Sequence, residues 1–181
     1  LCYGGYQMCV IAFTVTMLVK EIGWTLIEAG MLAGAMQIGG VAGRIGFSLL
    51  ADATRAGLAI LCAVGVATGA FGMAVAWLGP EAPQALLVLL LLGLSSCMLA
   101  WNGIMLAETA RISGRENVGL ATGGILALCF LSVVVMPPLF AFGYQQVGSF
   151  SATLGVFSLV PFVGAAAALV GWHRDHGIRT A

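Results

Sequence analysis

Residues 117–173 read NVGLATGGILALCFLSVVVMPPLFAFGYQQVGSFSATLGVFSLVPFVGAAAALVGWH, a run of 57 residues without Asp, Glu, Lys or Arg. Two more uncharged runs, of 25 and 26 residues, lie between Arg55 and Glu81 and between Glu81 and Glu108. Only 8% of the 181 residues are charged and 61% are hydrophobic, whereas about 25% of an ordinary soluble domain is charged. Uncharged runs of about 20 residues cross the bilayer core, about 30 Å thick, as helices. The chain is therefore predicted to be an all-α, polytopic membrane protein.

The uncharged runs divide into six predicted spans, which form one bundle over residues 1–172. A single helix of 57 residues would be roughly twice too long for a bilayer. We place a turn at Gly143–Ser149, where glycines and glutamines interrupt the run. The predicted spans are about residues 1–19, 25–50, 57–78, 85–107, 119–142 and 150–172, followed by a tail of residues 173–181. The chain begins inside an apolar run without an initiator Met, which predicts that an upstream part is absent.

The positions of Lys and Arg predict the orientation. Six spans place the second loop, the fourth loop and the tail on one side of the membrane. That side has six basic residues and the other has one: Arg44, Arg55, Arg111, Arg115, Arg174 and Arg179 against Lys20. Because cytoplasmic loops carry the excess of Lys and Arg, we predict a multi-pass protein of the inner (plasma) membrane with a cytoplasmic C-terminus. The net charge of zero and the lack of a basic stripe argue against nucleic acid as a partner.

Small residues and prolines predict how the spans pack and bend. GxxxG pairs, which let helix backbones approach closely in lipid, occur at Gly30–Gly34, Gly39–Gly43, Gly65–Gly69 and Gly119–Gly123. The second span has most of them, so we expect it deep in the bundle. Pro137 and Pro138 fall inside the fifth span and Pro161 inside the sixth, where each removes a backbone N–H and predicts a bend. These bends are either gating hinges or static kinks.

Neither the cysteines nor the histidines predict a metal or cofactor site. The five cysteines are scattered singly through apolar runs without a CxxC pair, as expected of small packing residues. His173, Asp175 and His176 form an HxDH pattern in the tail, which we interpret as a solvated tail. The prediction is therefore no metal and no cofactor.

Residues 43–57 read GRIGFSLLADATRAG and contain a predicted conformational latch. Arg44 and Asp52 are eight residues apart, just over two helical turns, so they lie on roughly one face. Arg55 follows in a short loop. An ionisable residue near a membrane interface can pair with a neighbour or with a helix end. Together Arg44, Asp52 and Arg55 are predicted to hold two helices in one conformation.

This stretch resembles the loop signature of the major facilitator superfamily, G-x-x-x-D-R-x-G-R-R, often preceded by Gly-Arg. Asp52 matches the Asp, while Ser48 replaces the glycine and Ala53 replaces the arginine. Later stretches resemble the tenth to twelfth helices of bacterial members: Trp101-Asn102-Gly103 through Glu108 and Arg111, Gly119 to Gly124, Pro137 to Phe140, and Gly148 to Phe150. The resemblance covers nearly the whole chain. It implies helices seven to twelve, the C-terminal half of a twelve-helix transporter, with an absent N-terminal six-helix half as partner.

The resemblance implies a secondary transporter with alternating access, which moves a small organic solute or anion between two halves. A proton or another ion is a candidate coupling partner. No acid lies at a span centre, so a coupling carboxylate is expected in the other half. Polar residues deep in spans are candidates for the substrate pathway, because they are costly in a membrane: Gln7, Gln37, Trp101 and Asn102. Hydrogen bonds that hold helices together are the other explanation for them.

Two alternatives to transport follow from the same sequence. Gly93-Leu94-Ser95-Ser96 loosely matches the nucleophile site of an intramembrane serine protease. That chemistry needs a histidine base within the membrane, and both histidines follow the last span, so we do not predict an enzyme. A non-transporting scaffold or sensor built on a transporter half is the second alternative. An upstream six-helix half would favour transport, and an upstream signalling domain would favour sensing.

Overall fold

Helices account for all the regular structure in the computed structural model, which describes residues 1–78 and 82–180, without the side chains of Arg115 and residues 175–180. The helices are α1 (Cys2–Lys20), α2 (Leu26–Thr54), α3 (Gly57–Trp77), α4 (Gln84–Met98), α5 (Trp101–Val147), α6 (Phe150–Phe157) and α7 (Leu159–Thr180). Six segments are long and apolar enough to cross a membrane: Cys2–Lys20, Leu26–Thr54, Gly57–Trp77, Gln84–Gly114, Glu116–Val147 and Phe150–Arg174. The predictions of an all-α chain and of six spans are confirmed.

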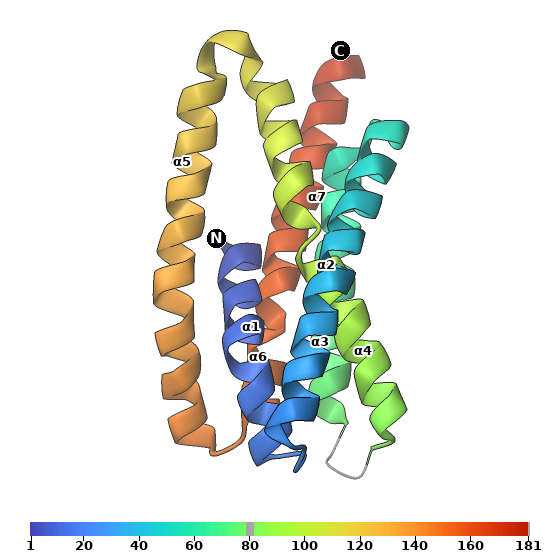
Figure 1. The fold of residues 1–181 in the computed structure, drawn as a ribbon. Helices are drawn as coiled ribbons and strands as arrows, with labels where there is room; N and C mark the ends of the chain where they lie inside the picture. Colours follow the sequence, from blue (N-terminus) through green and yellow to red (C-terminus); the bar gives the residue numbers. More distant parts are fainter. Residues whose placement is uncertain (79–81, 181) are drawn as a thin grey trace.

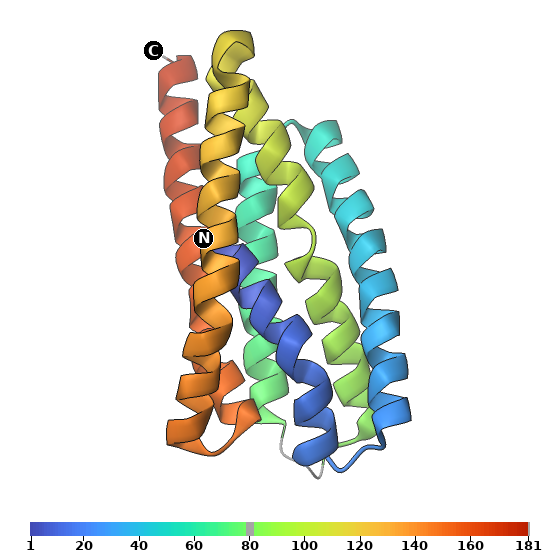
Figure 2. The same ribbon diagram turned by 60° about the vertical axis from the view of Figure 1, so that its left-hand side comes forward.

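The helices stand side by side along one long axis (Figure 1). Helix α5 is a hairpin, because Gly114 has non-helical angles (φ 70°, ψ 168°) and turns the chain back. We call residues 101–113 its first arm and residues 116–147 its second arm. Figure 2 shows α1 in front, between the second arm of α5 and α2, and α1 contacts both helices.

Helix α3 packs against α4, α5, α6 and α7. Its glycines receive aromatic side chains from other helices. The ring of Tyr3 lies against Gly65, the ring of Phe162 against Gly69, and the Tyr6 hydroxyl against Gly72. A Cβ at any of these glycines would overlap its neighbour, so their small size is required by the packing.

The expectation that the second span lies deep in the bundle is wrong. In α2 only Ala29, Leu32, Met36, Gly40 and Ala51 are buried, and 22% of its span is buried against 39% for α3. The Gly39–Gly43 pair does pack, against Ser95 and Ser96 of the neighbouring span, whereas Gly30 and Gly34 have no atom within 4 Å of an added Cβ. Small residues permit close approach, but they do not reveal which helix approaches.

Several helices extend beyond the predicted spans. Helix α2 continues to Thr54, where Arg55 ends it in the left-handed conformation (φ 52°), and α7 continues into the predicted tail as far as Thr180. The predicted turn at Gly143–Ser149 is confined to its end, because α5 continues to Val147 and Gly148 (φ 76°) ends it. Polar residues end an apolar run without ending the helix, so hydropathy marks the bilayer edge better than the helix end.

The prolines have two different outcomes. The sixth span is interrupted as predicted, since α6 ends at Phe157 and α7 begins at Leu159, two residues before Pro161. Pro137 and Pro138 lie within α5, where the backbone angles stay helical. The residue with non-helical angles inside α5 is Gly114. A hinge at Pro137 and Pro138 stays a prediction.

Candidate functional site

Three of the four predicted pathway residues line one cavity. Gln7 of α1 meets Trp101 and Asn102, the first residues of α5, around a space of about 140 Å³. The second arm of α5 closes the other side with Leu126, Cys129, Phe130 and Val133. The cavity therefore combines apolar walls with a few converging polar groups, which is the usual composition of a small-molecule site.

Trp101 joins two walls of this cavity through a hydrogen bond. Its side chain is 4% exposed, and its indole Nε1 donates to Gln7 Oε1 at 2.9 Å. A buried indole N–H without an acceptor would cost about 1–3 kcal/mol, so Gln7 is the group that permits a tryptophan here. The half-buried Asn102 side chain forms no hydrogen bond with the described residues. Asn102 is therefore a polar group of the cavity wall that is free for a ligand.

The position of the Trp101 ring is fixed from its other side. Tyr3 stacks on it with ring centroids 6.2 Å apart and planes at 21°. The Tyr3 hydroxyl in turn donates to the Leu61 carbonyl of α3 at 3.1 Å. Gly4 lies under the same ring, with a distance of 3.4 Å from an added Cβ to the ring. These contacts hold the Trp101 ring in place on its side of the cavity, which favours a preformed site.

A helix break lies beside the cavity, at the midpoint of a membrane span. The span Gln84–Gly114 is interrupted at Leu99 and Ala100, between α4 and α5. Ser95 and Ser96 both donate their hydroxyls to the Leu92 carbonyl at 2.9 Å. Such bonds from side chains back to the helix backbone bend helices. The predicted span over residues 85–107 lies within the membrane-spanning segment Gln84–Gly114, and the Ser95-Ser96 pair is the signal that could have revealed its interruption.

Gln37 does not reach this cavity. It lies on an exposed part of α2 and, like Arg44 seven residues later, makes no hydrogen bond or ion pair with the described residues. Because seven residues are nearly two full helical turns, Gln37 and Arg44 lie on one stripe of α2. The role of Gln37 in the pathway stays a prediction.

The proposed latch residues are all exposed: Asp52 and Arg55 lie at the end of α2, and Arg44 lies ten residues before its last residue, Thr54. Arg55 donates its backbone N–H to the Asp52 carbonyl at 3.3 Å, but no ion pair joins Arg44 to Asp52 among the side chains that the structure describes. The ion pair found on this side joins Arg111 Nη2 to Glu108 Oε2 at 2.5 Å. The latch stays a prediction. Glu81, and the side chains of Arg115, Asp175, His176 and Arg179, lie outside the described residues.

A carboxylate clamp at the opposite end was missed by sequence reasoning. Glu21, which follows α1, accepts the backbone N–H groups of Phe150 and Ser151, the latter at 2.9 Å, and the Ser151 hydroxyl at 2.6 Å. It thereby ties α1 to the start of α6. Partial burial raises the pKa of the Glu21 carboxyl, but the hydrogen bonds from Ser151 and Phe150 outweigh it, so the pKa lies below its ordinary value.

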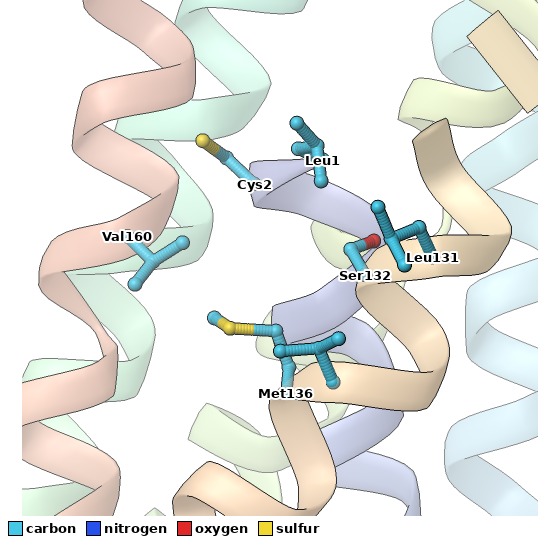
Figure 3. Close-up of a pocket in the computed structure, with 7 residues that line it drawn as sticks. Leu1, Cys2, Leu131, Ser132, Met136 and Val160 are labelled. Atoms are coloured by element: carbon cyan, nitrogen blue, oxygen red, sulfur yellow. The ribbon is translucent and has the colours of Figure 1, made fainter. Parts of the chain in front are cut away.

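A second, larger cavity of about 330 Å³ lies between the start of α1, the second arm of α5 and α7 (Figure 3). Its lining is apolar apart from Ser132, whose hydroxyl already donates to the Cys129 carbonyl at 2.7 Å. Without polar groups to orient a ligand, this larger cavity is a weaker candidate than the one at Trp101.

Comparison with known proteins assigns no family to this arrangement, since no protein-family model and no curated protein matches the chain.

Proposed function

We propose that this chain is the C-terminal six-helix half of a twelve-helix secondary transporter of the major facilitator type, without enzymatic activity. It moves a small organic solute or anion across the plasma membrane by alternating access. The observation that carries the proposal is the cavity of Gln7, Trp101 and Asn102 beside a helix break at the midpoint of a span. Polar groups at that depth are costly, and broken helices near the bilayer midplane are typical of transporter binding sites.

An uncovered face on the cavity side supports a partner half. Gly30 and Gly34 of α2, and Gly119, Gly123 and Gly124 of the second arm of α5, have no atom within 4 Å of an added Cβ. These two helices lie on either side of α1 (Figure 2), and α1 and the second arm of α5 line the cavity. Small residues suit close helix packing in lipid, and a second half placed against both helices would enclose the cavity between the halves, where such transporters bind substrate.

In this proposal the charged end of α2 controls the transition between conformations. Arg44, Asp52 and Arg55 are exposed and available to a second half, so their pairing can differ between the inward-open and outward-open states. The C-terminus is cytoplasmic, as the Arg distribution predicts, and Pro137 and Pro138 are candidate hinges in the second arm of α5.

The test is solute flux by the full-length protein in liposomes. We expect uptake of labelled solutes without ATP, measured with and without a proton gradient. Asn102→Ala should lower uptake about tenfold, since it removes the free polar group of the cavity wall. Asn117→Ala is the matched control, because Asn117 is exposed at the start of the second arm, outside the cavity. Strict dependence on ATP would exclude the proposal. Folded protein without flux would favour the alternative of a non-transporting sensor or scaffold.

A further inference from the structure

Arg44 is a cation inside a membrane-spanning helix and has no partner among the side chains that the structure describes. Helix α2 ends at Thr54, so Arg44 lies ten residues, about 15 Å, from that end of the helix. It forms no hydrogen bond or ion pair with the described residues. An arginine within a membrane span is costly, and such residues almost always face a water-filled cavity or a partner.

The neighbours of Arg44 place it beside the candidate cavity. Ser48 lies one helical turn further along the same stripe of α2. The Ser48 hydroxyl lies against Gly103, 2.5 Å from where a Cβ of that residue would stand. Gly103 directly follows Asn102, which lines the cavity. The stripe of α2 that contains Gln37 and Arg44 therefore meets the first arm of α5 at Ser48, next to the cavity wall, although no residue of α2 lines the cavity itself.

No described acid neutralises this arginine. The cavity is lined by uncharged side chains. Glu21 is bound to the start of α6 and Glu108 is paired with Arg111. Asp52 lies eight residues from Arg44, about 12 Å along the helix, and forms no ion pair with it. The site therefore has an uncompensated positive charge next to neutral hydrogen-bonding groups.

We infer that Arg44 binds the carboxylate of a small organic anion, with Gln37 as a second hydrogen-bond donor and the cavity of Trp101 and Asn102 holding the rest of the molecule. This inference rests on the proposed function and narrows its substrate to an anion. Arginine suits the task because its planar guanidinium stays charged and binds a carboxylate through two parallel hydrogen bonds. An anion between the halves would also remove the cost of a lone charge in the membrane.

The experiment compares acids with their neutral amides on the reconstituted full-length protein. The probes are labelled lactate and lactamide, succinate and succinamide, and benzoate and benzamide. Uptake is one readout, and the shift in melting temperature of the purified protein is the other. We expect uptake of at least one acid without its amide, at least a tenfold loss in Arg44→Gln, and partial retention in Arg44→Lys. Arg174→Gln, which removes an exposed charge near the end of α7, should match the wild type.

The outcomes separate this inference from the proposed function. Equal uptake of acids and amides, or normal uptake by Arg44→Gln, would overturn the anion site and leave transport standing. If no probe is taken up, the melting temperature decides: acids that stabilise the wild type but not Arg44→Gln support the site, and no stabilisation overturns it. If Arg44→Gln does not fold, Arg44→Lys and Gln37→Leu are measured in its place, and unchanged uptake and stabilisation in both would overturn the inference.

Discussion

Helix α3 and the first part of α2 each contain a GxxxG pair, and the two pairs have opposite surroundings. In α3, the rings of Tyr3 and Phe162 occupy the space beside Gly65 and Gly69. In α2, Gly30 and Gly34 have no neighbour within 4 Å of an added Cβ. The motif thus marks close packing inside this bundle in one helix and an uncovered face in the other. The function we propose depends on that difference, because the uncovered face is where a second half would close over the cavity.

The largest expected effect is on folding, from a side chain placed on the packed side. Gly72→Val would overlap the Tyr6 hydroxyl and Ser158 Oγ, which lie 3.0 Å apart in a buried hydrogen bond. Overpacking costs about 1–3 kcal/mol and an unpaired buried hydroxyl a similar amount, so most of the folded protein should be lost. Size-exclusion profiles and melting temperatures in detergent measure this.

Gly34→Val is the matched control on the uncovered side. The same side chain has open space there, so this six-helix bundle should fold normally, while flux through the full-length protein should fall because the second half can no longer approach α2. Equal losses of folded protein in Gly34→Val and Gly72→Val would refute the contrast between the two helices.

The next effect concerns the clamp on the packed side and depends on pH. Glu21→Gln removes a charged acceptor of three hydrogen bonds, and bonds to charged groups contribute about 1.5–3 kcal/mol. Because the folded-state pKa of Glu21 is lowered, its stabilisation is complete above the ordinary glutamate pKa, about 4.3, and disappears as the pH falls through the lower folded value. Melting temperatures from pH 7 downward should therefore drop more steeply in the wild type than in Glu21→Gln. Parallel curves would show that the clamp does not act through the carboxylate.

On the uncovered side, Asp52→Asn tests the latch. Asp52 is exposed and forms no ion pair with the described residues, so its substitution should leave folding unchanged. Conformational coupling is typically 1–3 kcal/mol, which corresponds to about a 5- to 150-fold slower transport rate. Uptake rates should fall more than ligand affinity in the full-length protein. Equal losses of rate and affinity would argue against a latch.

The smallest effect is expected at the boundary between the two sides, where Trp101 meets Gln7. Trp101→Phe removes the indole donor of the 2.9 Å bond to Gln7. Hydrogen bonds between membrane helices contribute about 0.6 kcal/mol on average and up to about 1.7 kcal/mol. A double-mutant cycle with Gln7→Met should give a coupling free energy in that range, measured from the free energies of unfolding. A coupling of zero would mean that the bond does not hold the cavity together.

The sequence predicts the number of spans and their beginnings well, because the bilayer imposes a length and an apolar composition on each one. It identifies Gln7, Trp101 and Asn102, together with Gln37, only as polar residues deep in their spans. The meeting of Gln7, Trp101 and Asn102 around one cavity could not be predicted, because it depends on how three helices pack.

The features that the sequence does not predict all depend on contacts between distant segments. Whether Gly34 is covered depends on the neighbours of α2, which composition does not reveal. The clamp joins Glu21 to Ser151, 130 residues away. The interruption at Leu99 lies next to Ser95 and Ser96, whose hydroxyls bond the helix backbone, and hydropathy does not reveal it. Each of these features needs the tertiary structure.

Alternating access is tested most directly by the accessibility of a cysteine at position 102. Asn102→Cys, in a full-length protein whose native cysteines are replaced by alanine, is treated with a membrane-impermeant maleimide in right-side-out and in inside-out vesicles. The account predicts that the reagent reaches the cavity from both sides, that an added transported anion slows labelling, and that the vesicles remain tight to ions. Labelling from one side only, or from neither, would contradict a substrate site that opens alternately to the two sides of the membrane.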